Sequence, residues 1–278
     1  MTLDCISSVI DSLGEESHEV IVVDNASTDG TCQAIRQAFP SVVLLENQSN
    51  SGYARAVNQA VRKSTSQVVL VANADVLFDY SIGLGFEFMA RNPHVAAMGC
   101  RQYYPDGRRQ RSYGREPSLR LAISELFFVE KVRSYFELRS RRKSPKSVEY
   151  ADGAVLWFNR EIFLALGGFD EDYFFYTEEA DFCHRARARG YSVVSNPEVS
   201  VVHYRGAATS GQSFGRETVD RLVSSKKLFL RKHSTAAKSR IIAGCYLAHH
   251  LANAFLYSCA GMLGSRSARV NARIQYRF

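Results

Sequence analysis

Residues 20–31, with the sequence VIVVDNASTDGT, decide the fold class of this chain. The run Val20–Val23 is short, apolar and β-branched, which predicts a buried strand. The next four residues have the composition of a turn, and a helical pattern then continues to Phe39, where Pro40 ends it. The stretch therefore predicts a strand, a loop and a helix in succession.

The same alternation continues through the following part of the chain. Further strands are predicted at Val42–Leu45, Val68–Ala72 and Val95–Cys100, and helices at Tyr53–Lys63 and Ile82–Arg91. Alternation of this kind predicts an α/β protein with a doubly wound, mostly parallel sheet.

Two carboxylates, Asp24 and Asp75, follow the first and third of these strands. Ligands of doubly wound sheets bind beyond the carboxyl ends of strands, so we expect both residues in one site. Asp24 can accept hydrogen bonds from a base or a ribose, and Asp75 is a suitable ligand for Mg²⁺ or Mn²⁺. The local alternatives are that Thr28 or Asp29 caps a helix and that Asp75 is a turn residue.

The second half of the chain carries a further set of predicted elements. These are a strand at Glu149–Asn159 that bends at Asp152-Gly153, helices at Arg160–Leu166 and Glu178–Arg189, and two short strands at Tyr191–Ser195 and Val199–Tyr204. After Gly206 the pattern predicts helix to the end.

A basic insertion, residues 101–148, separates the two halves. Two arginine-rich clusters flank the apolar helical stretch Leu119–Phe136. Two interpretations stay open: a solvated insertion, or an arm that faces an acceptor or lipid.

Charge and cysteine content narrow the class of protein. The net charge of +7 and the pI of about 9.1 favour anionic partners. No aromatic or basic recognition motif indicates nucleic acid, and we expect no nucleic-acid partner. The six cysteines are scattered without a CxxC pair, which predicts a reducing compartment and no disulfides.

The segment Asn50–Asn58, a turn followed by a predicted helix, offers candidate phosphate contacts. Gly52 opens a predicted helix and permits close approach of backbone. Arg55 and Asn58 lie three residues apart on one face of that helix, and Arg55 could reach a diphosphate. The alternative is an arginine that faces solvent.

Three carboxylates, Glu178, Glu179 and Asp181, crowd the first turn of a predicted helix. Acidic residues suit the helix dipole there. Crowding can also raise one pKa and create a general base. His203 ends an apolar strand, and a lone histidine is more often structural than a ligand.

Five segments, in this order, resemble the family 2 glycosyltransferases, especially their rhamnosyltransferase-like branch. They are VIVVDNASTDGT, NSGYARAVNQA, VLVANADV, ADGAVLWFNREIFLALGGFDEDYFFYTEEADFCHRARARGY and VVHYRG, from about Val20 to Gly206. The resemblance implies an α/β fold of GT-A type, with a doubly wound mixed sheet and a helical C-terminal extension. It also implies a nucleotide-sugar donor and Mg²⁺ or Mn²⁺ as cofactor.

The resemblance assigns roles residue by residue. The donor site would comprise Asp24, Asn25, Asp29, Gly52, Arg55, Asn58 and Asn73, the metal site Asp75 and His203, and the acceptor side Asp152, Gly153 and Trp157. Glu179 would act as the general base, a role that Glu178 or Asp181 could share.

Two departures from the family pattern matter. Glu179 stands where the family usually has Asp, so the base is one methylene longer. The segment Met1–Gly14 resembles the helix after the family's first strand, so we expect that strand to be missing and neighbouring strand edges to be exposed.

We expect a catalytic domain at residues 1–210 and a helical region at 211–278. Lysines and arginines between Lys226 and Arg240 precede the apolar stretch Ile241–Gly264, which favours an anionic membrane surface. Polar side chains near its middle, His249, His250 and Asn253, make spanning costly. We therefore predict an interfacial helix pair, with a helical cap on the core as the alternative.

The sequence thus predicts an inverting, metal-dependent glycosyltransferase of envelope or surface glycan synthesis. The expected partners are dTDP-rhamnose or a UDP-sugar as donor and a glycan or lipid-linked acceptor. The expected location is cytoplasmic, at the inner face of the cell membrane. One rival is a degenerate relative that binds without transfer; the other is a Rossmann oxidoreductase, against which the missing GxGxxG argues.

Overall fold

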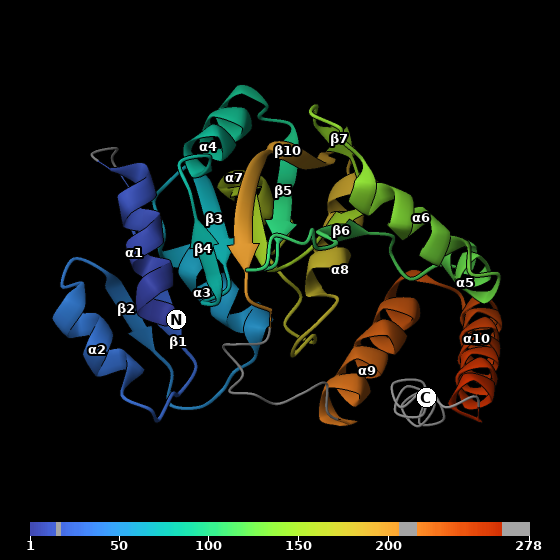
Figure 1. Cartoon of the computed structure of the whole chain (residues 1–278). Helices are drawn as coiled ribbons and strands as arrows, with labels where there is room; N and C mark the ends of the chain where they lie inside the picture. The colour runs from blue at the N-terminus through green and yellow to red at the C-terminus, as the bar shows by residue number, and fades with distance from the viewer. Residues whose placement is uncertain (15–17, 206–215, 263–278) are drawn as a thin grey trace. The chain divides into compact units, whose positions relative to one another are not determined.

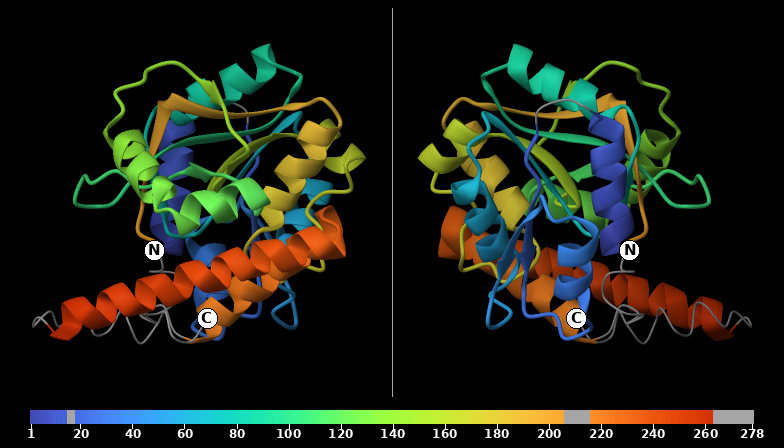
Figure 2. Two further views of the ribbon diagram at one scale, coloured as in Figure 1. Left: turned by 90° about the vertical axis from the view of Figure 1, so that its right-hand side faces the viewer. Right: turned by 90° about the vertical axis from the view of Figure 1, so that its left-hand side faces the viewer.

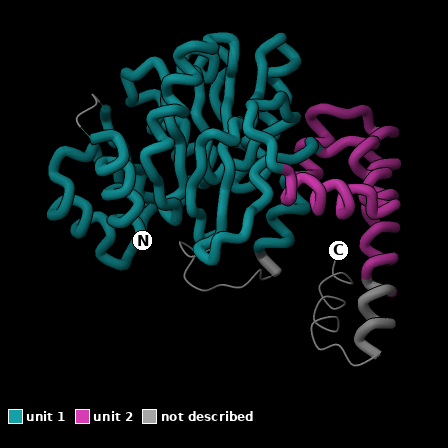
Figure 3. The backbone as a smooth tube through the Cα atoms, turned by 45° about the horizontal axis from the view of Figure 1, so that its top comes forward, with its two compact units in different colours: residues 1–116, 141–225 teal, residues 117–140, 226–278 magenta. Residues whose placement is uncertain are grey.

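The computed structural model describes residues 1–14, 18–205 and 216–262, and the chain divides into two compact units (Figure 3). Unit 1 comprises Met1–Glu116 and Arg141–Ser225, and unit 2 comprises Pro117–Ser140 and Lys226–Phe278. The middle of the predicted basic insertion therefore groups with the C-terminal helices. This division differs from the predicted boundary at residue 210.

A six-stranded sheet forms the centre of unit 1 (Figure 1). Its order is β3 (Val68–Ala72), β9 (Val155–Asn159), β5 (Val95–Tyr103), β10 (Ser192–His203) and β4 (Val76–Phe78), with β7 (Lys146–Ser147) also paired to β10. Among the described strands of this sheet, β5 and β10 pair in parallel and the other pairs are antiparallel. The sheet is mixed because β9, from much later in the chain, inserts antiparallel between β3 and β5.

Two smaller pairs complete the strands of unit 1. β1 (Ile21–Asp24) and β2 (Val43–Glu46) pair in parallel, and β6 (Tyr113–Gly114) pairs with β8 (Tyr150–Ala151). Within the described ranges, no ladder joins the β1–β2 pair to β3.

Helices cover both faces of the large sheet. One face packs against α3 (Tyr53–Lys63), α7 (Arg160–Ala165) and α8 (Glu178–Ala188), and the other against α1 (Thr2–Leu13) and α4 (Ile82–Arg91). α2 (Thr31–Ala38) packs beside β2 and α1. The predicted helix at the start of the chain is therefore present as α1.

β9 shows how the two cores are built from one strand. Leu156 and Phe158 point into the α3–α7–α8 core, whereas Val155 and Trp157 point into the α1–α4 core. Alternate side chains of a strand face opposite sides, so a strand buried on both faces reads as continuously apolar.

Three predicted elements differ from the structure. The predicted strand Glu149–Asn159 breaks into β8 and β9 at its Asp152-Gly153 bend. The two strands predicted around Asn196-Pro197 are one strand, β10, because a register shift between Asn196 and Ser200 absorbs the irregular residues. The stretch Leu119–Phe136 forms two helices, since Phe128 adopts a left-handed conformation.

Unit 2 is helical. It contains α5 (Leu119–Leu126), α6 (Val129–Arg139), α10 (Ala236–Met262) and the end of α9 (Arg216–His233). α10 packs along α5 and is a single long helix (Figure 2). A small core of Ala122, Leu230 and Ile242 joins these helices. No helix in the described part of the chain is long and apolar enough to cross a membrane.

Two glycines of α4 give a matched test of this packing. A Cβ on Gly85 would lie 2.6 Å from Cε2 of Trp157, whereas a Cβ on Gly83 would meet nothing within 4 Å. We expect Gly85→Ala to destabilise the fold by about 1–3 kcal/mol through overpacking. Gly83→Ala should be neutral or stabilise by up to about 1 kcal/mol, because alanine favours helix. Denaturant unfolding of both variants measures this, and equal losses would contradict the packing described.

Candidate active site

The end of β10 lies beside the start of β4, and this pairing brings His203 to Asp75. The strands run antiparallel with His203 opposite Val76, and the Tyr204 N–H donates to the Asp75 carbonyl at 2.9 Å. His203 Nε2 lies 3.4 Å from Asp75 Oδ1, and both side chains are buried. The two residues predicted to bind metal are therefore neighbours, although they are far apart in the sequence.

Two glutamines hold His203 from its other side. Gln102 Oε1 lies 3.3 Å from His203 Nδ1, and the Gln110 side chain donates to the His203 carbonyl. Both glutamines are buried. When Nδ1–H donates to Gln102, the imidazole presents the lone pair of Nε2 toward Asp75, which is the tautomer that a metal ligand requires. Sequence reasoning did not identify either glutamine.

Asp75 and His203 offer one carboxylate oxygen and one imidazole nitrogen. This donor set suits Mn²⁺ or Mg²⁺ when substrate phosphates and water supply the other ligands. Among the residues that the structure describes, no cluster of three His, Cys, Asp or Glu could hold a metal alone. The pair fits a cation that arrives with a phosphorylated substrate.

A strained turn leads into α8, which begins with the buried Glu178 and the half-buried Glu179. Tyr176 and Thr177 have φ values of 74° and 75°, a left-handed conformation that side chains rarely adopt. Each such residue costs about 1–3 kcal/mol and persists only where the surroundings hold it. The Asp181 N–H donates to the Thr177 carbonyl, so the helix begins directly after the strained residues.

The bend between β8 and β9 faces Glu179. A Cβ on Gly153 would lie 3.7 Å from the Glu179 side chain. The Asn73 N–H donates to the Ala154 carbonyl at 2.9 Å, so the turn that carries Asp75 lies beside the same bend. Predicted metal, acceptor and base residues are thereby linked through neighbouring backbone.

The glutamates carry buried oxygens that the described part of the protein does not satisfy. Oε2 of Glu178 and Oε2 of Glu179 each lack a hydrogen-bond partner there. Burial, and then the charge of Asp152, raises the pKa of Glu179 to about 7. Burial, and then the charge of Glu179, raises the pKa of Glu178 well above its usual value. A carboxyl group with a pKa near 7 is suited to accept a proton at neutral pH.

Tyr53, the first residue of α3, reaches the same place. Its hydroxyl donates to the Gly153 carbonyl at 2.7 Å. Burial raises its pKa most. Four carboxylates add to this effect, in decreasing order Glu178, Glu179, Asp152 and Asp75. Four carboxyl groups therefore lie around one phenol, which stays protonated. Tyr53 stands within a recognised motif, yet no sequence signal gave it a role.

Asp24 and Asn25 lie where β1 ends. Burial raises the pKa of Asp24, but hydrogen bonds from Ser27, Cys32 and Ala26 outweigh it and lower the pKa overall. Asn25 Nδ2 donates to the Gly52 carbonyl at 3.3 Å, and Asn25 Oδ1 accepts from Asn47 and Ser51. These contacts tie the β1 loop to the loop before α3.

Gly52 permits a close approach, and the group that approaches it is the backbone of Phe174. Its φ is 86°, and a Cβ there would lie 2.7 Å from the Phe174 carbonyl oxygen. The Tyr53 N–H donates to that carbonyl at 2.8 Å. Gly52 therefore seats the segment that leads into Glu178 and Glu179.

Three other predicted donor contacts have partners within the protein. Asp29 is exposed and accepts from the N–H and hydroxyl of Thr31, so it holds the turn that leads into α2. Asn58 is buried and hydrogen-bonds both the N–H and the carbonyl of Phe169. Arg55 Nε lies 3.0 Å from Glu171 Oε2. The structure thus gives Asp29 and Asn58 scaffolding contacts and pairs Arg55 with a carboxylate.

Two predicted site residues are structural. Asp181 is buried and forms an ion pair with Arg185 at 2.7 Å, so its carboxylate is held by a residue of the same helix. Trp157 is fully buried at the centre of β9, where it contacts α4, and it cannot touch an acceptor. Arg185 lies four residues after Asp181, a spacing from which the ion pair could have been predicted.

Comparison with known sequences identifies the family of this chain. The sequence model of glycosyl transferase family 2 matches residues 1–167. The chain belongs to this family. It is 30% identical over 230 residues to an N-acetylglucosaminyl-diphospho-decaprenol L-rhamnosyltransferase of Mycobacterium tuberculosis, covering 77% of this chain and 73% of the relative. It is therefore a glycosyltransferase.

Solved structures show the same fold. A mannosyltransferase from Pyrobaculum calidifontis, in complex with GDP-Man and Mn²⁺, aligns with a TM-score of 0.61 at 20% identity, covering all of this chain and 81% of that one. GalNAc-T7 with UDP, GalNAc and Mn²⁺ aligns with a TM-score of 0.51 at 13% identity, over 70% of this chain and 40% of that one. The GT-A-like fold predicted from the sequence is confirmed.

The raised pKa values predict how stability depends on pH. A carboxyl group whose pKa is raised in the folded state contributes stability below its unfolded pKa and loses it as pH rises through the folded pKa. We expect Glu179→Gln to remove part of the stability loss between pH 5 and 8, because the amide cannot ionise. The variant should exceed the wild type at pH 8 by about 1–3 kcal/mol. Thermal or denaturant unfolding across this pH range measures the difference.

Glu171 supplies a control of opposite sign. Its pKa is lowered, chiefly by a hydrogen bond from Asn58 and also by Arg62 and Arg55. Glu171→Gln should therefore lose stability at pH 8. Equal pH slopes in the wild type and in Glu179→Gln would show that Glu179 ionises without cost.

Proposed function

We propose that this glycosyltransferase is inverting and metal-dependent, and that it transfers a sugar from a nucleoside-diphosphate donor to a hydroxyl group of a lipid-linked or polysaccharide acceptor. The observation that supports it most is the Glu178–Glu179 pair, in which each residue has a buried oxygen and the pKa of Glu179 is raised to about 7, in the same unit as the Asp75–His203 pair. One group can take up a proton, and the other can hold a cation.

The chemistry divides between these two groups. Glu179 removes the proton from the acceptor hydroxyl, whose oxygen attacks the anomeric carbon from the face opposite the diphosphate. The bond between the anomeric carbon and the diphosphate oxygen breaks, and the diphosphate leaves with the electron pair. A divalent cation held by Asp75 and His203 would neutralise the charge on that leaving group.

The remaining residues position the reactants. Asp24 and Asn25 lie at the end of β1, where a base and ribose can be bound, and Tyr53 holds the Gly153 carbonyl beside Glu179. Burial, and then the neighbouring Asp152, raises the pKa of Glu179 and strengthens it as a base. Asn73 lies in the turn that leads to Asp75.

Similarity to the mycobacterial rhamnosyltransferase supports dTDP-rhamnose as the donor and a lipid-linked acceptor. A UDP-sugar is the second donor to be tested. A lipid-linked acceptor would place the reaction at the inner face of the cell membrane, in synthesis of an envelope or surface glycan.

A second candidate function is binding of a nucleotide sugar without transfer. It is favoured by the β1–β2 pair, which no ladder joins to β3 within the described residues. That candidate predicts donor binding with no product, in the wild type as in active-site variants.

Transfer assays with Glu179 variants test the proposal. We expect Glu179→Gln to lower kcat by about 10²–10⁴-fold, because a positioned base contributes that much. Glu179→Asp, which restores the usual family residue, should keep far more activity than Glu179→Gln. The product should have the anomeric configuration opposite to the donor, as NMR can show. Retained configuration, or full activity in Glu179→Gln, would refute the proposed roles.

A further inference from the structure

α6 exposes its apolar side and covers its charged side. Arg133 lies on the covered side, where its guanidinium pairs with Glu130 at 3.5 Å and Glu137 at 3.1 Å. Glu130 is 7% exposed and Glu137 is 19% exposed at the side chain. The opposite stripe consists of Val129, Val132, Tyr135 and Phe136, which are between 52% and 66% exposed. A helix that packs only in water would place these two sets the other way round.

α10 has the same inverted arrangement. Its covered side contains polar groups: Asn253 Nδ2 lies 2.7 Å from His249 Nε2, and Lys131 Nζ of α6 donates to Asn253 Oδ1 at 3.1 Å. Its exposed apolar residues are Ile241, Leu247, Leu251 and Phe255, each more than half exposed. At 1.5 Å per residue this stripe is about 21 Å long.

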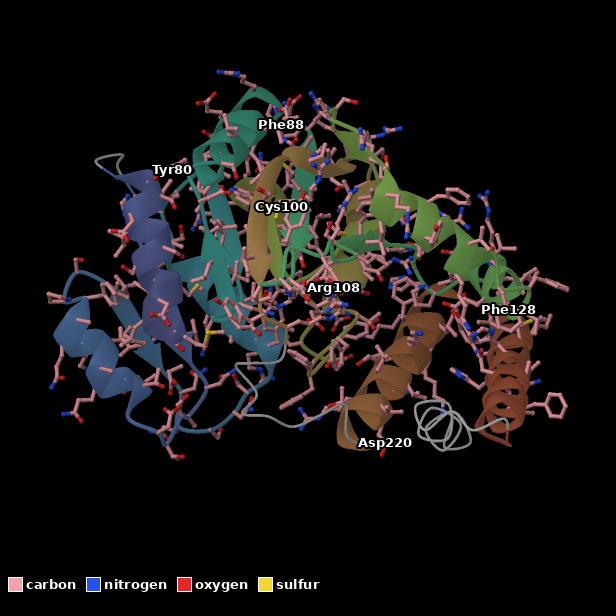
Figure 4. The ribbon with its side chains drawn as sticks, viewed as in Figure 1. Tyr80, Phe88, Cys100, Arg108, Phe128 and Asp220 are labelled. Carbon is pink, nitrogen blue, oxygen red and sulfur yellow. The ribbon has the colours of Figure 1, made fainter. Side chains whose placement is uncertain are left out.

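Exposed apolar side chains are concentrated in unit 2. Ile123 and Phe127 of the α5 segment add to the two stripes, and Phe128, labelled in Figure 4, lies at the junction of α5 and α6. Ten of the fifteen large apolar side chains found exposed among the described residues belong to unit 2. Exposed patches of this extent mark a surface that binds another phase or partner.

Unit 2 is also strongly basic. Its sequence carries fourteen Lys and Arg against three Glu, a net charge of +11, so unit 1 carries −4 of the chain's +7. From Lys226 onward the sequence contains no Asp or Glu. One cation lies directly against an apolar stripe: the Arg139 guanidinium stacks 3.6 Å from the centre of the Tyr135 ring.

We infer that the apolar stripes of α6 and α10, with Ile123 and Phe127, insert into the headgroup region of an anionic lipid bilayer. Apolar and aromatic side chains with neighbouring Lys and Arg are the composition of interfacial helices. A second copy of unit 2 is disfavoured as the partner, because two units that each carry a net charge of +11 repel each other. The covered His249 and Asn253 fit helices that lie in the membrane plane.

Membrane binding would bring the enzyme to the lipid-linked acceptor, and in this respect the inference rests on the proposed function. The test of membrane binding itself does not require glycosyl transfer. The full chain is sedimented with vesicles of phosphatidylcholine alone or of an equimolar mixture with phosphatidylglycerol. We expect binding to the anionic vesicles and binding about tenfold or more weaker to the neutral ones, because each basic residue near the surface adds to the attraction.

Two double variants and a matched control locate the surface. Val132→Glu with Phe136→Glu, and Leu251→Glu with Phe255→Glu, should each lower binding to anionic vesicles about tenfold or more. Tyr80→Glu is the control, since Tyr80 is 88% exposed in unit 1 (Figure 4) and should leave binding unchanged. Circular dichroism checks the folding of each variant.

The outcomes separate the alternatives. Absence of binding to anionic vesicles, or equal binding by all variants, would overturn the inference. Light scattering that shows a dimer in the wild type and a monomer in the double variants, without vesicle binding, would identify a second copy as the partner instead. Vesicle binding without any glycosyl transfer would leave this surface intact and refute the proposed function alone.

Discussion

The site depends on acidic side chains whose buried oxygens lack hydrogen-bond partners among the described residues. Glu178 and Glu179 begin α8 beside Asp152, and each has a buried oxygen that no described group binds. Burial of a carboxylate is costly unless it is paired, so the fold holds this cluster at the expense of stability. The pKa of Glu179, raised to about 7, is the direct consequence.

Several separate contacts are needed to hold this cluster. The strained Tyr176–Thr177 pair leads directly into Glu178 and Glu179. Gly52 allows the Phe174 backbone to approach the start of α3, and the Tyr53 hydroxyl donates to the Gly153 carbonyl. The helix dipole of α8 offsets part of the charge. Strain and buried charge of this kind are typical of sites where function, rather than stability, fixes the residues.

The sequence predicted the elements whose signals are local. The strand Val68–Ala72 and the helices Tyr53–Lys63 and Ile82–Arg91 have the predicted bounds, because a continuous apolar run and a 3.6-residue period each define one element. It failed where distant segments meet. Nothing local shows that β9 inserts between β3 and β5, and the expectation of a mostly parallel sheet was wrong for that reason.

The contrast between local signals and contacts of distant segments also applies to the site. Asp75, His203 and Glu179 could be named because they stand in segments that resemble the family's motifs. Gln102 and Tyr53 could not be named, since their roles exist only through contacts across the fold. Trp157 lies in a recognised motif, but its motif position reflects packing under α4. Membership of a motif does not distinguish a contact residue from a core residue.

Unit 2 shows a case where covered and exposed faces matter more than composition. Polar residues near the middle of α10 made a spanning helix costly, and in the structure two of them, His249 and Asn253, lie on the covered side. The exposed apolar stripe of α10 is a property of the folded unit, which the hydropathy of the sequence alone does not reveal.

Ligand-induced thermal stabilisation, measured with nucleoside diphosphates with and without Mn²⁺, tests the site most directly. A ligand at 100 times its Kd stabilises the folded state by roughly 2.7 kcal/mol. The wild type should show a stabilisation by one nucleotide that depends on Mn²⁺, and Asp75→Ala should lose the part that depends on the metal. No stabilisation by any nucleotide, or the same Mn²⁺-dependent stabilisation in Asp75→Ala, would contradict a donor site built around Asp75 and His203.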